Sequence, residues 1–128
     1  MQAMNAKTPL EQAIEKARAG QMPIADMLRV FASGPVLVPS ASEVKSDGDG
    51  LMPLYLDKEG TPMVVCFTDF ARIGEEARAA APFCMQIEGE GFLRMVPPGC
   101  GLVVNPGTQM GFDMSPEGLQ QFLRENDR

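Results

Sequence analysis

The amino-acid sequence predicts an α+β fold, with a mixed sheet of about five or six strands flanked by helices, a helical hairpin at the N-terminus and a helix at the C-terminus. Apolar residues recur at helical spacing near both ends of the chain, and short apolar or alternating runs typical of strands lie between them. The chain has 128 residues, of which 45% are hydrophobic and 22% charged. These values suit one globular domain, so we expect residues 1–128 to form a single unit.

Two helices are expected at the N-terminus. The segment Thr8-Pro9-Leu10-Glu11 offers an N-cap residue, a proline at the first helical position and a glutamate placed for a capping box. Apolar residues then follow at helical spacing until Gly20. A second apolar stripe, residues 24–31, begins after Pro23. Two short amphipathic helices joined by a tight turn form a helical hairpin, and each needs a surface that covers its apolar face.

The middle of the chain predicts strands. Residues 36–38 form a short apolar run that ends at Pro39, and residues 40–50 are polar and read as an exposed loop. Residues 51–57 and 62–67 flank a turn-forming sequence, so we expect a hairpin whose loop has four or five residues. The run 63–67 is apolar on both faces, which is typical of a central strand covered from two sides.

The second half of the chain continues with alternating signals. Thr68-Asp69 can cap a third helix that carries Phe70, Ile73 and Ala77. The elements expected after it are a strand over residues 83–87, a short helix over 92–96, a buried strand over 102–104, a turn over 105–107, a strand in which Met110, Phe112 and Met114 alternate with Gln109, Gly111 and Asp113, and a last helix that starts at Ser115-Pro116-Glu117.

Charge and composition exclude several function classes. The net charge is −6, and the 11 Lys and Arg residues form no cluster, which argues against nucleic-acid binding and against an anionic membrane surface. No signal peptide and no apolar run long enough for a membrane span is visible. The odd number of widely spaced cysteines, Cys66, Cys84 and Cys100, suits reduced thiols. We therefore expect a cytoplasmic protein.

The sequence offers no catalytic, metal or cofactor motif, so we expect a protein that is not an enzyme. It contains no histidine, which excludes histidine-based triads, metal ligands and proton shuttles. The glycine patterns fail the dinucleotide and phosphate-loop fingerprints. The acidic segment Asp47-Gly48-Asp49-Gly50 starts like a calcium loop, but Met52 and Lys58 stand where a glycine and a glutamate are required. A solvated turn explains that segment.

Cysteines and carboxylates are the remaining candidates for reactive groups. Cys100 lies between two glycines and is the best candidate for a reactive thiol, but no basic residue within five positions would lower its pKa. Its alternative role is that of a small apolar residue, and Cys66 and Cys84 are expected in the core. The pairs Glu75-Glu76 and Glu88/Glu90 lack apolar surroundings in the sequence and read as solvated faces.

Binding to another protein is the function that remains. Loops held on rigid strands are the usual place for recognition residues, so we expect Asn105, Pro106 and Gly107 to contribute to a partner surface; turn geometry is their alternative role. The 10 methionines are expected in the core, although methionine-rich grooves can also adapt to partners.

The order of these segments resembles the N-terminal domain of the SseB family, named for enhanced serine sensitivity. The resemblance is carried by TPLEQAIEKARAG at 8–20, PVLVPS at 35–40, DGLMPLYLDKEGTPMVVCFTD at 49–69 and LRMVPPGCGLVVNPGTQMGFDMSPEGL at 93–119. It implies a bacterial α+β module without established enzymatic activity. We therefore expect a non-enzymatic cytoplasmic protein-binding or regulatory module; the alternative is a module that senses a small molecule, an amino acid, linked to serine tolerance.

Overall fold

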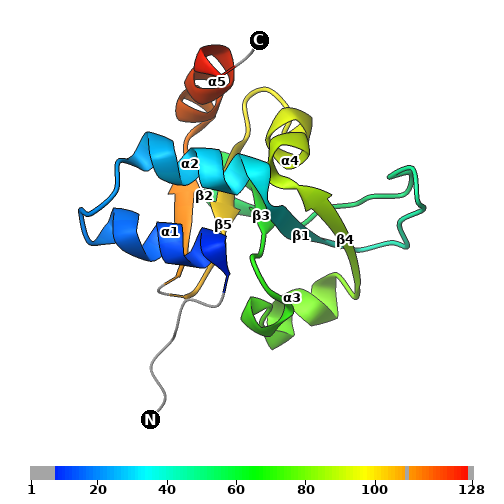
Figure 1. Cartoon of the computed structure of the whole chain (residues 1–128). Helices are drawn as coiled ribbons and strands as arrows, with labels where there is room; N and C mark the ends of the chain where they lie inside the picture. The colour runs from blue at the N-terminus through cyan, green and yellow to red at the C-terminus, as the bar shows by residue number, and fades with distance from the viewer. Residues whose placement is uncertain (1–7, 109, 127–128) are drawn as a thin grey trace.

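The computed structural model describes residues 8–108 and 110–126, and within them helices flank six strands (Figure 1). This confirms the predicted α+β class, with the helical hairpin at the N-terminus and the helix at the C-terminus. The elements in order are α1 (Pro9–Arg18), α2 (Ile24–Ser33), β1 (Pro35–Ser40), β2 (Tyr55–Lys58), β3 (Thr61–Cys66), the 3-10 helix η1 (Phe70–Arg72), α3 (Glu75–Ala80), β4 (Phe83–Glu88), α4 (Gly89–Met95), β5 (Gly101–Val104), β6 (Phe112–Met114) and α5 (Pro116–Glu125).

The strands form two hydrogen-bonded groups that meet at β3. One group is the antiparallel pair β1-β4, and the other has the order β2-β3-β5-β6, with β3 and β5 parallel. The N–H groups of Val65 and Phe67 point to the same edge of β3; the first donates to Leu54 and the second to Leu37 at 2.8 Å. The segment leading into β2 and strand β1 therefore lie one after the other along this edge, which links the groups into the mixed arrangement that the sequence predicts.

The main core lies between the strands and four helices. Its buried residues come from α1, α2, α4 and α5 on one side and from strands β1, β3 and β5 on the other; Ile14, Phe31, Phe92, Leu119, Val64 and Leu102 are examples. The opposite face of the strands carries a smaller cluster of Leu37, Val65, Phe67 and Ile73. All residues from Met63 to Phe67 are buried, which confirms that β3 is a central strand with both faces covered.

Local capping chemistry fixes the helix starts as predicted. The Thr8 hydroxyl accepts a hydrogen bond from the Glu11 N–H at 3.0 Å, and the Ser115 hydroxyl accepts one from the Gly118 N–H at 3.0 Å. Helices α2 and α4 then pack closely because Gly89 has no side chain. A Cβ at Gly89 would lie 1.8 Å from the Phe31 carbonyl oxygen, which leaves no room for any other residue.

The predicted hairpin loop is longer than the loop in the structure. The hairpin loop between β2 and β3 has only two residues, Glu59 and Gly60, with φ of +52° and +91°. This is the geometry of a type I′ turn, which matches the twist of the two strands, so Asp57 and Lys58 remain in β2. The prediction of a four- or five-residue loop was wrong.

The predicted third helix is split in two. Asp69 caps η1 by accepting from the Ala71 N–H at 2.8 Å, but the helix stops at Ile73-Gly74 and α3 starts only at Glu75. The Arg78 guanidinium donates to the carbonyls of Phe70 and Ile73, which stabilises this break. As a consequence, the Phe70 side chain is exposed instead of lying on a helical apolar face.

Strands β1, β2 and β6 have clearly different bounds from those predicted. β2 was predicted over residues 51–57 but covers only Tyr55–Lys58. β1 includes Pro35 and Pro39 and continues to the buried Ser40. β6 is shorter than the alternating run, because the carbonyls of Met110 and Gly111 accept hydrogen bonds from side chains instead of pairing with β5. Gln109, which belongs to the predicted run, lies outside the described residues. Within the described residues, no helix combines the length and apolarity that a membrane crossing requires.

Candidate functional site

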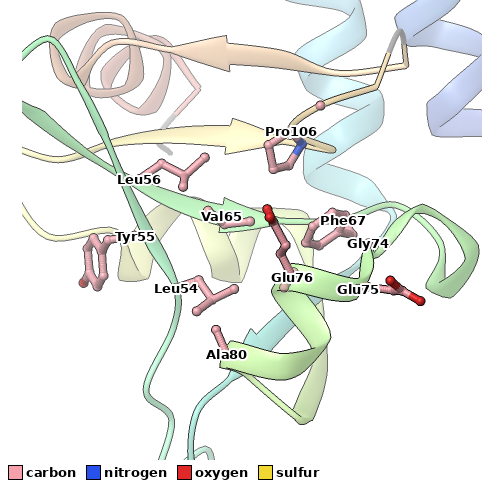
Figure 2. Close-up of a pocket in the computed structure, with 12 residues that line it drawn as sticks. Leu54, Tyr55, Leu56, Val65, Phe67, Gly74, Glu75, Glu76, Ala80 and Pro106 are labelled. Atoms are coloured by element: carbon pink, nitrogen blue, oxygen red, sulfur yellow. The ribbon is translucent and has the colours of Figure 1, made fainter.

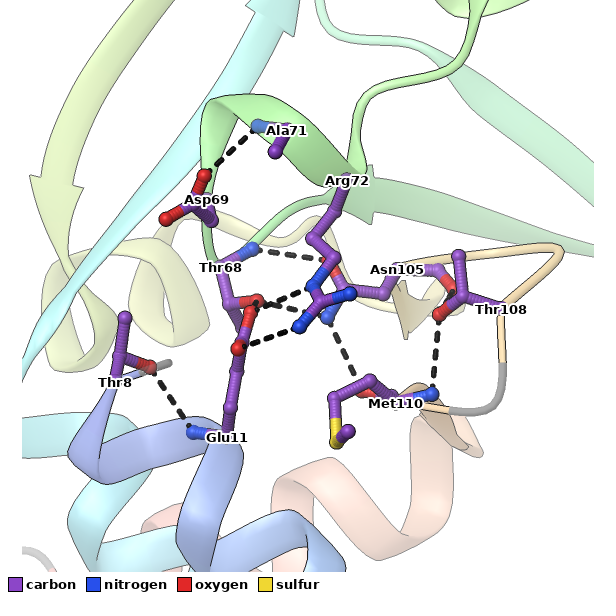
Figure 3. A network of polar contacts seen from close by, with 9 residues as sticks. All are labelled: Thr8, Glu11, Thr68, Asp69, Ala71, Arg72, Asn105, Thr108 and Met110. Atoms are coloured by element: carbon purple, nitrogen blue, oxygen red, sulfur yellow. Dashed lines mark hydrogen bonds and ion pairs between the residues drawn. The ribbon is translucent and has the colours of Figure 1, made fainter. Parts of the chain in front are cut away.

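The structure separates the three residues that the sequence predicts as a partner surface. Asn105 is 0% exposed and has a φ of +51°, whereas Pro106 and Gly107 lie beside an open pocket. The side-chain amide oxygen Oδ1 of Asn105 accepts a hydrogen bond from the Thr68 N–H at 3.0 Å. The amide nitrogen Nδ2 of the same side chain donates to Thr68 Oγ1 at 2.8 Å and to the Met110 carbonyl at 3.1 Å (Figure 3). The side chain of Asn105 therefore holds the β5–β6 connection, and only the residues after it reach the surface.

A buried ion pair continues this polar network. The Glu11 carboxylate is 0% exposed and accepts from Arg72 Nε at 3.0 Å and from Arg72 Nη2 at 2.9 Å (Figure 3). The Thr68 hydroxyl also donates to this carboxylate. Hydrogen bonding to Glu11 raises the pKa of the Arg72 guanidinium above its ordinary value. Both charges are thus neutralised by each other in the interior.

The network connects three parts of the fold. In residues 8–108 and 110–126, no buried side-chain nitrogen or oxygen lacks a hydrogen-bond partner, those of this network included. It ties α1 to η1 and to the β5–β6 connection. The capping-box position that the sequence predicts for Glu11 does not include this role. The available signal was its position beside Leu10 and Ile14, at the edge of the apolar stripe of α1.

The β5–β6 connection that this network fixes forms one wall of a pocket, which we call the sheet-face pocket. Its volume is about 620 Å³. Val65 and Phe67 form its floor, Leu54 and Leu56 one side, and α3 with Pro106 and Gly107 the other walls (Figure 2). A volume of this size, with mainly apolar walls and few polar groups, is typical of ligand and partner sites.

The pocket is open because this face of the strands is covered at β3 but not at β2, whose four residues are all exposed. Four helices pack on the main core, but only η1 and the six-residue α3 pack on the face with Val65 and Phe67. As a result, the Leu56 side chain remains 46% exposed and Ala80 is exposed at the end of α3. Apolar side chains that gather around an opening are more informative than single exposed ones.

The charges at the pocket are negative. Glu75 and Glu76 start α3, and Figure 2 shows the Glu76 side chain extending over the pocket toward Pro106, while the Glu75 carboxylate points away. Among the described residues that line the pocket, none is Lys or Arg. Glu75 and Glu76, which the sequence predicts on a solvated face, thus lie at the rim of this apolar pocket.

The cysteines lie apart from this pocket. Cys66 is buried, and burial raises the pKa of its thiol well above the ordinary value of 9.0. Cys84 is half-buried, not fully in the core as predicted, and burial raises its pKa as well, although a backbone hydrogen bond with Val38 opposes the shift. Cys100 is half-buried and packs against the main core, the position of a small apolar residue. The raised pKa values of the Cys66 and Cys84 thiols disfavour the thiolate that a nucleophile requires.

The acidic segment around Asp47 and the methionines are two further sets of candidate residues. Asp47 forms a turn in which its carboxylate accepts from the Asp49 N–H at 2.9 Å, and the described residues contain no group of three or more His, Cys, Asp or Glu side chains that fits a metal ion. Met63 and Met110 are buried. Met85 and Met95, in contrast, line a second groove of about 590 Å³ below the loop that contains Asp47.

A third, smaller cleft lies between α2, α4 and α5. It has a volume of about 240 Å³, with Leu93 and Phe122 among its apolar residues. Arg29 and Arg94 line it together with Glu90. Arg29 is paired with Asp26 at 2.5 Å and Arg94 with Glu90 at 3.1 Å, and all four side chains are largely exposed. The cleft thus offers charges of both signs next to an apolar wall.

The part of the chain that builds these sites matches a known family. The model of the family described as SseB protein N-terminal domain matches residues 10–121. This range runs from α1 into α5 and includes the buried network and all walls of the sheet-face pocket. Searches of the curated proteins and of the solved structures gave no match.

Proposed function

Because the chain belongs to the family of SseB protein N-terminal domains, whose model covers residues 10–121, we propose that it is a non-enzymatic module that binds another protein through the sheet-face pocket. The observation that carries the proposal is this pocket of about 620 Å³, open to solvent on a face that only short helices cover. Binding sites in proteins bury apolar side chains of the partner in such pockets, where most of the binding energy is concentrated.

The reactive groups support a binding role over catalysis. The buried Glu11 carboxylate is occupied by Arg72 and Thr68, and burial raises the thiol pKa of Cys66 and Cys84. An acid-base or thiol mechanism needs groups with the opposite properties, free in a cleft and tuned toward neutral pH. The free cysteines suit a reducing compartment, and we place the module in the cytoplasm.

Two neighbouring alanines of α3 provide the test. Ala79 and Ala80 are both exposed, but only Ala80 lines the pocket. A random peptide library displayed on phage is selected on the wild-type chain, and the affinity of the selected peptides is measured by calorimetry. We expect A80R to weaken binding at least ~10-fold, since a blocked apolar pocket loses more than ~1.4 kcal/mol, and A79R to leave it unchanged.

A second pair of variants tests the opposite wall. L56D places a charge beside the pocket, and I24D places the same charge on α2, where Ile24 is 64% exposed and remote from the pocket. Binding should be lost in L56D and kept in I24D. Equal effects of the two substitutions, or equal affinities of A80R and A79R, would show that the peptides bind elsewhere and would contradict the proposal.

A specific observation also favours the small-molecule alternative, at a different place. The cleft between α2, α4 and α5 has the guanidinium groups of Arg29 and Arg94, which suit a carboxylate, and the Glu90 carboxylate, which suits an ammonium group; a ligand would exchange with the exposed pairs that these groups form with Asp26 and with each other. An amino acid fits its volume of about 240 Å³. A thermal-shift panel of amino acids should then show stabilisation in the wild type that R94Q abolishes. A panel in which no amino acid raises the melting temperature removes this alternative.

A further inference from the structure

The rim of the sheet-face pocket carries one carboxylate that is directed over its opening. Glu76 is exposed in the first turn of α3, and its side chain extends toward Pro106 above the apolar floor (Figure 2). Within the described residues its carboxylate has no hydrogen-bond or ion-pair partner of its own. Its charge is therefore available to whatever enters the pocket.

No cationic side chain on the described walls compensates this charge. The nearest arginine along α3, Arg78, donates to the carbonyls of Ile73 at 3.0 Å and Phe70 at 2.8 Å and does not line the pocket. The Lys58 ammonium is paired with Asp113 at 2.6 Å and does not line the pocket. The whole chain carries a net charge of −6, so the long-range field has the same sign as the rim.

An apolar occupant alone would be at a disadvantage here. When a side chain fills the pocket, it removes water from the Glu76 carboxylate and weakens the solvation of that charge. An occupant that also brings a Lys or Arg to the rim replaces the lost water by a charge-assisted hydrogen bond. An acidic occupant would be repelled both at the rim and at a distance.

We infer that the partner of the sheet-face pocket is a protein segment in which an apolar side chain enters the pocket and an adjacent Lys or Arg pairs with Glu76. This inference deepens the proposed function and rests on it. The apolar residue supplies most of the affinity, and the basic residue selects the partner and speeds its approach.

The test compares two glutamates in equivalent positions. Glu76 is the second residue of α3 and Glu117 the second residue of α5; both are exposed in a first helical turn, but only Glu76 lines the pocket. E76Q and E117Q therefore remove the same charge and the same helix-dipole interaction. Peptides selected on the wild-type chain from the random library serve as probes, and their sequences, affinities and dependence on NaCl concentration are measured.

We expect the selected peptides to combine apolar residues with Lys or Arg and to lose affinity as NaCl is raised. E76Q should weaken them by about two- to fivefold, the effect of one exposed or half-buried ion pair, and E117Q should leave them unchanged. The affinity of the peptides for E76Q should depend less on NaCl concentration than their affinity for the wild-type chain.

Other outcomes separate this inference from the proposed function. The selected peptides could be neutral or acidic, and their binding could be blocked by A80R but be insensitive to E76Q and to NaCl. This outcome would overturn the inference of a basic partner and leave the proposed binding pocket in place. Peptides that A80R does not affect would overturn both. If analytical ultracentrifugation finds a dimer of the chain that A80R dissociates and A79R does not, the occupant is a second copy and the inference is wrong.

Discussion

The substitution R72M removes the guanidinium that neutralises the buried Glu11 carboxylate. Arg72 donates two hydrogen bonds, at 3.0 and 2.9 Å, and the side chains of Arg72 and Glu11 are only 7% and 0% exposed. Without Arg72 the carboxylate keeps the hydrogen bond from the Thr68 hydroxyl, which is a weak substitute for a paired charge. Removal of one partner from a buried pair costs about 3–5 kcal/mol, so R72M should lower the free energy of unfolding by this amount.

The assay is urea denaturation followed by circular dichroism. For a loss of about 4 kcal/mol and a slope of about 2 kcal/mol per M, the midpoint should fall by about 2 M. K58M is the matched control, since it breaks the Lys58–Asp113 pair, which is shorter at 2.6 Å but 55% and 42% exposed. An exposed pair of this kind contributes at most about 1 kcal/mol, so the midpoint of K58M should move little.

The double variant E11L/R72M shows whether the charge or the contact matters. Replacement of both members of a buried pair by apolar residues is often neutral or stabilising, so the double variant should recover most of the stability that R72M loses. If R72M loses less than about 1 kcal/mol, or if E11L/R72M is as unstable as R72M, the charges are not buried as a pair and the reasoning is refuted.

Three further predictions concern single positions. G89A should destabilise the protein by at least about 3 kcal/mol in urea denaturation, because its Cβ would lie 1.8 Å from the Phe31 carbonyl oxygen. In G91A, a variant of the same helix, the new Cβ meets only a side chain, so the free energy of unfolding should change by no more than about 1 kcal/mol. Equal effects of the two substitutions would contradict the close packing of α2 and α4. N105A should lose about 2–4 kcal/mol, because buried Thr68 and Met110 groups lose their partners, and a loss below about 1 kcal/mol would mean that Asn105 is not a buried anchor. Cys66 keeps its proton in the folded state, whereas the unfolded thiol ionises with a pKa near 9.0. The free energy of unfolding should therefore fall above that pH by up to about 1.4 kcal/mol per pH unit. C66A should remove this part of the pH dependence, and a pH dependence that C66A leaves unchanged would refute the burial of the protonated Cys66 thiol.

The exposure of Pro106 and Gly107 could be predicted from the sequence, because a turn after a buried strand must come to the surface. Both residues line the sheet-face pocket, and their contact with a partner stays a prediction. Glu76 was read as part of a solvated helix face, because sequence spacing gives no information on which distant strand lies opposite that face. The first residue of the predicted trio, Asn105, has its side chain turned inward, because the loop needs a donor and an acceptor for Thr68 and Met110.

The sequence by itself determined the fold class, the helix starts at Thr8 and Ser115, and the central, doubly buried strand β3. These features depend on caps, turn residues and apolar periodicity, which act between residues a few positions apart and are therefore readable along the chain. Only the tertiary structure decided the Glu11–Arg72 pair, whose members are 61 positions apart, and the pocket that β2, α3 and the β5–β6 connection enclose. Such contacts arise when packing brings distant segments together, and no local pattern specifies which polar groups will meet or which part of a sheet face remains uncovered.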